Sequence, residues 1–228
     1  MAKLIDVVFD LETTALVATA APMQLAACAF DREHLGEFLP ERLNEGFDLR
    51  SAFIEGCFTF DDNTAQWWSK RSEGVKDKLC SLEGIEVSCI VSRLALYVTN
   101  VMKAHNADCI CLWCQGSDFD IPILRQVAHH FEQLQGQKNE KKWPWKHYQF
   151  RDARTFVLEG GCQYFELTPA DVALDPYQVY RRIAQYTAPA DITHDADFDC
   201  HKTAWGVMDV MSLNATSHSI GNGTFVLF

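Results

Sequence analysis

Strand-like segments cluster in the first fifty residues of the chain, and strand-like and helix-like segments alternate after them. Residues 4–10 (LIDVVFD), 23–30 (MQLAACAF) and 47–50 (FDLR) are typical of strands, and their closeness favours an antiparallel meander. Two further strands are expected at 109–114 (CICLWC) and 148–155 (YQFRDART). A meander followed by alternating strands and helices predicts an α/β domain with a mixed five-stranded sheet flanked by helices.

Helix-like segments lie between and after these strands. Residues 86–105 carry apolar side chains at three- and four-residue spacing, which is typical of an amphipathic helix. The expected helices are residues 64–79, 86–105, 119–134 and 195–213, with a less regular helical region within 156–190. Thr64 is a candidate N-cap for the first of them.

The length and composition fit one globular domain. With 228 residues, 48% of them hydrophobic, the chain can bury a full core, so we expect one domain over residues 1–213 and a tail over 214–228. Apolar runs are far shorter than a membrane span, and the first residues pass directly into a strand. We therefore expect a cytoplasmic protein with no membrane partner, while the oligomeric state stays open.

The chain is acidic, with a formal net charge of −11. Such a charge argues against binding to nucleic acid through a broadly basic surface, and solubility alone accounts for much of the acidic excess. Nucleic-acid binding would need metal ions or local basic patches that reverse the sign of the potential at the site.

Nine cysteines are many for this length, and a reducing compartment makes disulfides unexpected. The run CICLWC invites a zinc or thioredoxin-like interpretation. A zinc site would need a second pair of ligands at matching spacing, and a redox motif would open a helix rather than lie in an apolar strand. We expect Cys109, Cys111 and Cys114 to be buried core thiols.

Two carboxylates lie at the end of the first expected strand. Asp10 and Glu12 are two residues apart in VVFDLETT, so their side chains project from the same face of an extended chain. A hard divalent cation such as Mg²⁺ prefers oxygen ligands of this kind. Two solvated acids at a strand-to-turn junction would give the same pattern, so the spacing leaves both interpretations open.

A second acidic pair follows the strand at 109–114. In WCQGSDFDIPIL a glycine-containing turn places Asp118 and Asp120 around the start of a helix. Asp118 is suited to cap that helix. Asp120, followed by Pro122 in the first turn, lies where its carboxylate could face the edge of the sheet, and it is the candidate functional residue.

A third acidic group opens the last expected helix, within ITHDADFDC. A helix that begins near Asp195 presents Asp199 one turn in, and leaves His194 in the preceding loop near the same face. Asp195 is then most simply a helix cap, and Asp197 a solvated acid of the first turn, both favoured by the helix dipole. His194 and Asp199 are the candidates for metal or substrate chemistry.

In chain order these residues give Asp-x-Glu, then Phe-Asp, then His-x4-Asp, and the chain resembles the DEDDh, DnaQ-like 3′–5′ exonuclease superfamily. Within it, the chain is most similar to phage exonuclease A and the Rv2179c-like exoribonucleases. The matching stretches, in order, are VVFDLETT, QWWSKRS, WCQGSDFDIPIL, YQFRDART and HDADFDC. Each is short, but five in one order make a coincidental match improbable. The resemblance implies a ribonuclease H-like fold.

The resemblance also implies a role for each candidate residue. Asp10, Glu12 and Asp199 would hold the tighter of two Mg²⁺ or Mn²⁺ ions, with Asp10 bridging to the second ion and Asp120 supporting that ion through water. Ions about 4 Å apart can stabilise both the attacking and the leaving oxygen of an in-line displacement. His194 would deprotonate the attacking water, since a histidine with a pKa of about 6.5 accepts a proton near neutral pH. Without metal, the carboxylates should be partly protonated.

Substrate contacts are implied in the same way. The backbone beside Leu11 and Thr13 would contact the 3′-terminal nucleotide, Leu11 would wedge against its base, and Phe119 would shape the pocket. Arg151 and Arg154 would contact phosphate or pair with the acidic site. Ordinary core or turn positions are the alternative for each.

Basic and aromatic residues interleave in the expected loop at 135–147 and just after it, a composition that suits single-stranded nucleic acid. The residues are Lys138, Lys141, Lys142, Trp143, Trp145, Lys146 and Tyr148. A solvated loop with its tryptophans folded onto the body explains the composition equally well. The QWW stretch at 66–68 fits a core anchor better than a base-stacking surface.

The expected function is a metal-dependent 3′–5′ exonuclease acting on the 3′ end of single-stranded or frayed DNA. The likeness to phage exonuclease A favours DNA, and places the protein in the host cytoplasm if its origin is a phage. An exoribonuclease of the same fold is the runner-up. An inactive nucleic-acid-binding module would be supported by loss of one of the five site residues, and all five are present. An HD phosphohydrolase, suggested by His194-Asp195, would need an all-helical fold.

Overall fold

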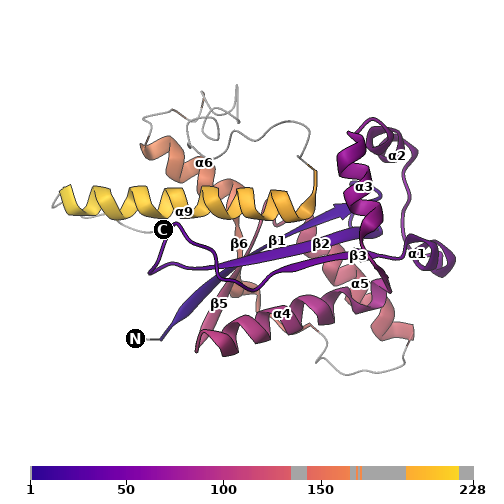
Figure 1. Ribbon diagram of the computed structural model, residues 1–228, viewed down its shortest axis with the longest axis horizontal. Coiled ribbons are helices and arrows are strands. Elements are labelled where there is room, and N and C mark those ends of the chain that lie inside the picture. Colours follow the sequence, from indigo (N-terminus) through magenta and orange to yellow (C-terminus); the bar gives the residue numbers. More distant parts are fainter. Residues whose placement is uncertain (1, 135–142, 165–167, 169, 171–193, 221–228) are drawn as a thin grey trace.

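The computed structural model of the protein describes residues 2–134, 143–164, 168, 170 and 194–220, and shows one mixed sheet with helices on both faces (Figure 1). The strand order is β4-β3-β2-β1-β5-β6. The strands are β1 Leu4–Thr13, β2 Pro22–Asp31, β3 Leu43–Phe47, β4 Gly84–Ile85, β5 Cys109–Cys114 and β6 Phe150–Asp152. The helices are α1 Leu49–Glu55, α2 Asp62–Ser69, α3 Glu73–Ser81, α4 Ile90–Ala104, α5 Asp120–Leu134, α6 Ala153–Tyr164 and α9 Ala196–Ile220, with 3-10 turns at Val87–Cys89 and His147–Gln149.

Strand pairing confirms the expected meander and the mixed sheet. Strand β2 pairs antiparallel with both β1 and β3, whereas β5 pairs parallel with β1 and with β6. The sixth strand, β4, has two residues and pairs with the edge strand β3, which is why the sheet has one strand more than expected. Because β1, β5 and β6 are parallel, their carboxyl ends lie at the same edge of the sheet.

The alternation of side chains in β1 decides which of its residues share a face. Ile5, Val7 and Phe9 belong to the core between the sheet and helices α4 and α5. Val8 belongs to a second core, on the face that α6 and α9 cover. Residues two apart on a strand share a face, so Asp10 and Glu12 point to the α9 side.

The expected helix at 64–79 is two helices, α2 and α3. Asp61, not Thr64, caps α2, because its Oδ2 accepts the Thr64 N–H at 2.7 Å. Ser72 Oγ accepts the Val75 N–H at 3.3 Å and starts α3. Of the two N-caps, Asp61 precedes residues 64–79 and Ser72 lies within them, so Ser72 marks the break that the apolar spacing conceals.

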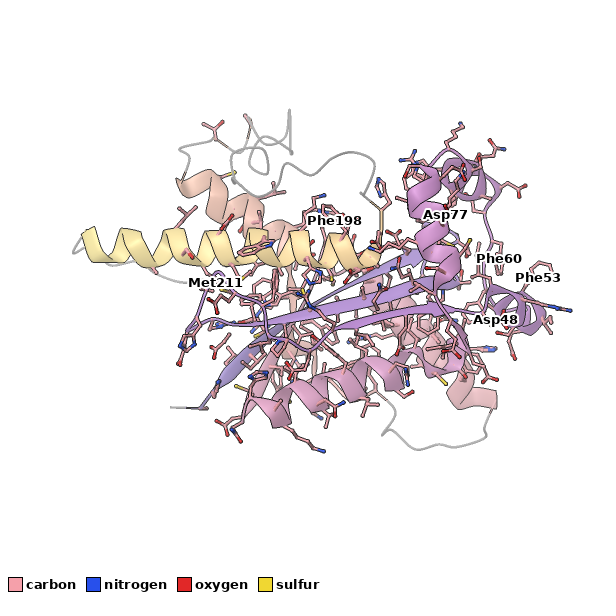
Figure 2. The ribbon with its side chains drawn as sticks, in the orientation of Figure 1. Asp48, Phe53, Phe60, Asp77, Phe198 and Met211 are labelled. Carbon is pink, nitrogen blue, oxygen red and sulfur yellow. The ribbon has the colours of Figure 1, made fainter. Side chains whose placement is uncertain are left out.

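The corner between α1 and α2 is closed by two exposed aromatic residues. Phe53 and Phe60 meet edge to face with ring centroids 5.5 Å apart. Both are labelled at the right of Figure 2, near Asp48. Asp48 begins α1 by accepting the Arg50 N–H at 2.9 Å. The strand expected at 47–50 was therefore placed too late: β3 ends at Phe47, and a capped helix follows.

Two other boundaries differ from expectation. The strand expected at 148–155 ends at Asp152, whose carboxylate accepts the N–H groups of Ser117 and Thr155 at 2.7 Å each and so starts α6. The last helix continues to Ile220, beyond the expected end at 213, because the sequence has no glycine or proline between Gly206 and Gly221. Of the helical region expected within 156–190, residues 165–167, 169 and 171–190 lie outside the described part.

The cysteines and tryptophans are placed unevenly. Cys111 and Cys114 are buried, as expected, but Cys109 is exposed at the start of β5.

Trp145 is 6% exposed and packs in the core against Trp143, which supports the alternative of tryptophans folded onto the body. Lys138, Lys141 and Lys142 lie outside the described residues. None of the described helices is long and apolar enough to cross a membrane.

Candidate active site

Four carboxylates and a histidine meet where β1 ends. Asp10 and Glu12 lie near the end of β1, and Asp120 is the first residue of α5. Asp199 lies in the first turn of α9, and His194 precedes that helix. The Asp10 carboxylate is close enough to Asp120, Glu12 and Asp199 for their charges to act on it. One ligand atom from each of Glu12, His194 and Asp199 lies within 4.8 Å of the others. The structure thus brings together all five residues singled out from the sequence.

A third acid on the same face of β1 shows how a purely structural carboxylate is treated. Asp6 is fully buried and accepts hydrogen bonds from Arg32 Nε at 2.8 Å, Arg32 Nη2 at 2.6 Å and Trp113 Nε1 at 2.7 Å. Among the described residues, the carboxylates of Asp10 and Glu12 have no cation or N–H partner of this kind. Asp10 and Glu12 are half-buried, and two neighbouring acids partly withdrawn from water without a partner are costly, so this pair points to an external cation.

The pKa values reflect that cost. Burial raises the pKa of Asp10 well above its usual value, and the charges of Asp120, Glu12 and Asp199 raise it further. Burial and then the charge of Asp199 raise the pKa of Glu12 in the same way. Burial raises the pKa of Asp120 to about 8, although Arg154 acts in the opposite direction. Without a cation, the group therefore holds protons at neutral pH.

His194 is held in an unusual backbone conformation. Its φ of 71° lies in the left-handed region, which residues other than glycine rarely adopt. Its N–H donates to Asp199 Oδ2 at 2.8 Å, so a member of the acidic group fixes the loop that carries the imidazole. Burial lowers the pKa of His194, while Asp199 raises it and Arg71 lowers it. The imidazole is therefore neutral near pH 7 and able to accept a proton.

Helix α2 forms a wall beside His194. The rings of Trp67 and His194 meet edge to face with centroids 4.6 Å apart, and the Arg71 guanidinium lies 4.0 Å from the Trp67 ring centre. Trp68 Nε1 donates to the Thr13 carbonyl at 3.1 Å. None of the α2 residues is buried. The expectation that QWW is a core anchor was therefore wrong: its indoles contact the histidine and the end of β1.

A polar bridge joins β2 and α3 to the start of α9. Gln24 Nε2 donates to Asp195 Oδ1 at 2.8 Å, and Gln24 Oε1 accepts the Ala196 N–H at 3.1 Å. Lys78 pairs with the other oxygen of Asp195. Sequence reasoning missed Gln24 and Lys78, because their partners lie more than a hundred residues away and no local motif marks them.

The remaining acids divide as their neighbours dictate. The Asp195 carbonyl accepts the Asp199 N–H at 2.8 Å, so its backbone starts the helix while its carboxylate belongs to the bridge. Asp197 is half-buried, with Lys78 at 3.9 Å and His201 at 3.5 Å, rather than a freely solvated acid. Asp118 is exposed.

Three of the expected nucleotide contacts have mainly structural side chains. Leu11 is 5% exposed and belongs to the core beneath β1. Thr13 is buried, and its Oγ1 donates to the Ala15 carbonyl at 2.9 Å. Phe119 is partly buried against the same core, directly before Asp120. Leu11 and Thr13 could therefore offer a nucleotide chiefly their backbone.

The two arginines lie on the exposed side of the site. Arg151 is exposed and donates to the Phe150 carbonyl at 2.8 Å, and Arg154 donates to the Gln115 carbonyl at 3.3 Å. Arg154 crosses Gly116, whose φ of +99° requires glycine and where a Cβ would lie 3.2 Å from the guanidinium. The glycine turn after β5 thus gives Arg154 its path towards Asp120.

The donor set fits a hard divalent cation. Asp10, Glu12, Asp120 and Asp199 offer only oxygen ligands, the kind that Mg²⁺ and Mn²⁺ prefer. A cation would also compensate the repulsion that raises the pKa values of this group. Chemically, the arrangement combines a cation-binding carboxylate group with a neutral imidazole that can take a proton.

Comparison with known proteins supplies the family. Residues 5–173 match the 3′–5′ exoribonuclease Rv2179c-like domain. An exodeoxyribonuclease of Enterobacteria phage T4 is 31% identical over 210 residues, which cover 86% of this chain and 85% of the phage protein.

Solved structures agree on the fold. The crystal structure of cell-death related nuclease 4 (CRN-4) has a TM-score of 0.55 at 11% identity, over 92% of this chain and 64% of that one. A full-length 3′-exonuclease has a TM-score of 0.50 at 9% identity, over 96% and 84% of the two chains. These likenesses support the expected ribonuclease H-like fold. From the family match and the phage relative, the chain belongs to the Rv2179c-like family of DEDDh-type 3′–5′ exonucleases.

Proposed function

We propose that this protein removes nucleotides from the 3′ end of single-stranded or frayed DNA by metal-dependent hydrolysis. One observation carries the proposal. Asp10, Glu12, Asp120, His194 and Asp199, from three separate stretches of the chain, meet at the end of β1. Lys202 lies 3.6 Å from Asp199 and Arg154 lowers the pKa of Asp120, but Asp10 and Glu12 have no cation partner among the described residues. Membership of an exonuclease family supports the reaction type.

Each residue has a distinct task in this scheme. Asp10, Glu12 and Asp199 would hold one Mg²⁺ or Mn²⁺ ion, and Asp10 with Asp120 would hold a second. Bound divalent ions would supply charge stabilisation for the attacking and leaving oxygens of the phosphodiester. The His194 imidazole, neutral because burial lowers its pKa, accepts the proton of the attacking water. Asp199 also orients that histidine through the His194 N–H.

Two further groups would position the substrate strand. The N–H and carbonyl groups beside Leu11 and Thr13 adjoin the carboxylates and suit a 3′-terminal nucleotide. Arg151 and Arg154, exposed beyond β5, suit the phosphates of the preceding nucleotides. The acidic chain would thus bind an anionic substrate through its cations and a few arginines.

The sugar of the substrate distinguishes the first proposal from its runner-up. The 31% identical relative is named an exodeoxyribonuclease, whereas the family match is described as an exoribonuclease-like domain. The alignment with the phage relative spans 210 residues and covers 86% of the chain, whereas the family match spans 169 residues. The longer match is to the exodeoxyribonuclease, which favours DNA. RNA is the second candidate.

The test is a side-by-side time course on 5′-labelled DNA and RNA strands of one sequence in Mg²⁺. We expect a ladder that shortens stepwise from the 3′ end and a higher rate on DNA. His194→Ala should lower the rate by about 10²–10⁴-fold, the usual contribution of a general base. A circular DNA strand should stay intact, and its cleavage would exclude an exonuclease. A faster reaction on RNA would select the runner-up.

An inactive binding module is tested by metal alone. Mg²⁺ should raise the melting temperature of the wild type and not that of Asp10→Ala, because Asp10 would contact both ions. A melting temperature of the wild type that neither Mg²⁺ nor Mn²⁺ changes would favour the inactive module.

A further inference from the structure

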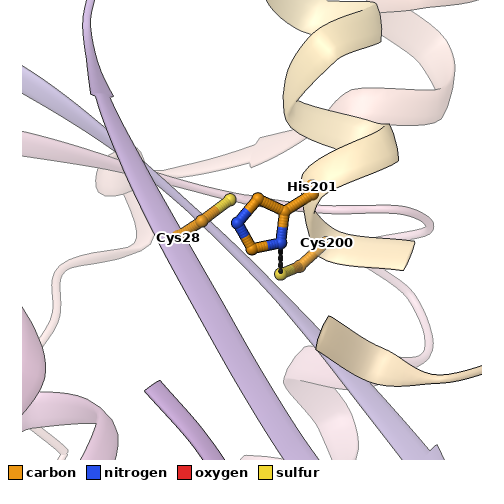
Figure 3. A group of neighbouring side chains, drawn as sticks. All are labelled: Cys28, Cys200 and His201. Carbon is orange, nitrogen blue, oxygen red and sulfur yellow. Dashed lines mark hydrogen bonds between the residues drawn. The ribbon is translucent and has the colours of Figure 1, made fainter. Parts of the chain in front are cut away.

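A second group of metal-binding side chains lies beside the carboxylates but belongs to a different chemistry. Cys28 of β2 and Cys200 and His201 of α9 place one ligand atom each within 4.8 Å of one another (Figure 3). Both cysteines are buried and His201 is partly buried. None of the three has a task in the proposed nuclease reaction.

We propose that Cys28, Cys200 and His201 form a Zn²⁺ site that joins β2 to α9. Two thiols and an imidazole are ligands that zinc accepts and that Mg²⁺ disfavours. Ligands of a tetrahedral zinc ion are about 3.5–3.8 Å apart, given Zn–S and Zn–N distances of about 2.3 Å and 2.0 Å. The ligand atoms lie within 4.8 Å of one another, so binding a zinc ion would require them to close by about 1 Å. The fourth position is left for water.

The orientation of His201 supports this assignment. Its Nδ1 lies 2.5 Å from the Asp197 carbonyl oxygen one turn earlier, so this nitrogen carries the proton and donates it there. Nε2 is buried and has no hydrogen-bond partner among the residues that the structure describes. Nε2 lies on the Cys28 side of the ring, whereas the Cys200 Sγ lies 3.6 Å from Nδ1 (Figure 3), so coordination by Nε2 and both thiols requires the Cys200 side chain to turn towards Nε2. Zinc-binding histidines commonly donate their other ring N–H to a carbonyl in this way.

A route from solvent reaches His201, the least buried member of the group. A surface cavity of about 480 Å³ opens beside His201, lined by Arg42, Asn44, Lys78, Asp197, Phe198 and His201. An entry path is one of the requirements for a metal site. The Cys200 thiol donates to the Asp197 carbonyl at 3.2 Å, the same carbonyl that accepts from His201. The first turn of α9 therefore holds the thiol and the imidazole close together.

The site would fix the part of α9 that carries the carboxylate group. Cys200 directly follows Asp199, and Cys28 pairs across the sheet with Val8, two residues before Asp10. A zinc ion would therefore tie the first turn of α9 to the middle of the sheet. This role is structural and independent of the proposed nuclease function.

Cobalt distinguishes the two groups, because thiolate coordination gives an intense near-ultraviolet charge-transfer band that carboxylates cannot give. Co²⁺ is titrated into the reduced full chain as wild type, Cys28→Ser and Cys200→Ser, with Cys57→Ser and Cys80→Ser as controls. We expect a band that saturates near one ion per chain in the wild type and both controls, and that Zn²⁺ abolishes. Both site variants should lose it.

The His201→Asn variant tests the imidazole and covers the case in which a buried serine prevents folding. It keeps both thiols and lies at the more accessible end of the group, and it should weaken Co²⁺ binding by at least about 10-fold. Circular dichroism identifies the folded variants. Absence of the band in the wild type, or its full retention in a folded Cys28→Ser or His201→Asn protein, would overturn the proposal.

Discussion

Three aspartates within one helical turn differ completely in their surroundings. Asp195 bonds to Gln24 and Lys78, Asp197 lies near Lys78 and His201, and only Asp199 faces Glu12. The three residues are all aspartates in neighbouring positions, and they differ only in the side chains around them. Substituting each in the same way therefore tests which surroundings matter for the site.

We expect Asp199→Asn to reduce the exonuclease rate by about 10³-fold or more, because it removes the negative charge of a proposed metal ligand while an amide oxygen can still accept the His194 N–H. Asp197→Asn should stay within about threefold of the wild type, since surface ion pairs contribute little. Single-turnover rates on a labelled DNA strand at saturating Mg²⁺ measure both. Equal losses in the two variants would mean that the helix start, rather than a metal ligand, limits the rate.

The raised pKa of Asp120 makes a second prediction, for the metal-free protein. In the unfolded chain this carboxyl titrates near pH 4, and in the folded chain at about 8. Between these values the folded state binds more protons, so the free energy of unfolding decreases as the pH rises from about 4 to about 8. Below about pH 4 both states are protonated and the contribution is complete.

We therefore expect the melting temperature in EDTA to decrease across this window, and Mg²⁺ to restore much of it at about pH 8. Asp120→Asn cannot ionise, so it should flatten the decrease and raise the melting temperature by about 2–4 °C for each kcal/mol relieved. The exposed Asp77 of α3 provides the control, since it is not among the charges that act on Asp120 and Asp77→Asn should leave the slope unchanged. Equal slopes in all three proteins would show that Asp120 titrates normally.

The five site residues could be singled out from the sequence because each lies in a short local pattern, and the resemblance to the DEDDh exonucleases joined these patterns into one expected site. Spacing on a strand pairs Asp10 with Glu12, and a helix start marks Asp120 and Asp199. Residues such as Gln24 and Lys78 could not be found in this way. Their identities are ordinary, and their importance arises only when tertiary contacts place them against Asp195.

At the scale of elements, the α2–α3 pair holds the entrance to α9. Trp67 contacts His194 from α2, and Lys78 pairs with Asp195 from α3. Neither contact touches the carboxylate group itself. The pair therefore positions the histidine loop, and its loss should affect the reaction more than the fold.

Lys78→Ala should decrease kcat by about 10-fold or more while leaving the melting temperature within a few degrees, because small displacements of a catalytic group are costly. Lys76→Ala is the matched control: Lys76 lies on the same helix, pairs with the exposed Glu73 and donates to the Ser69 carbonyl at 3.4 Å, away from Asp195. Arginine at 78 should recover part of the rate. A change in KM alone would indicate instead that Lys78 binds the strand.

The same region explains where prediction of elements failed. The pattern over 64–79 fits one amphipathic helix, and the caps Asp61 and Ser72 that divide it are recognisable only once the break is known. Strand β6 was predicted too long because Asp152, an unremarkable strand residue in sequence, caps both α6 and the turn after β5. Long apolar strands such as β1 and β2 were predicted well because burial on both faces leaves little choice.

At the scale of the whole molecule, the net charge of −11 constrains how an anionic strand is bound. A protein that holds nucleic acid through many lysines and arginines loses affinity steeply as the salt concentration rises. For single strands, each phosphate contact lowers the logarithm of the affinity by about 0.7 for every tenfold increase in salt. Here the proposed contacts are the metal group and two exposed arginines, Arg151 and Arg154. The expected slope of log affinity against log salt is therefore shallow, about −1.4.

Binding can be measured with His194→Ala, which keeps all four carboxylates but cuts slowly, using a fluorescent DNA strand in Mg²⁺ from about 50 to 200 mM KCl. Adding Arg151→Ala should make the slope shallower by about 0.7, whereas Arg50→Ala on the distant α1 should not change it.

Lys138, Lys141 and Lys142 lie outside the described residues and provide the decisive comparison. A wild-type slope of −3 or steeper that their joint replacement by alanine reduces would locate the strand on that basic segment. A shallow slope that the replacement does not change would indicate that the bound metal ions and the two arginines form the binding surface. Such a surface would allow an acidic protein to bind an anionic strand.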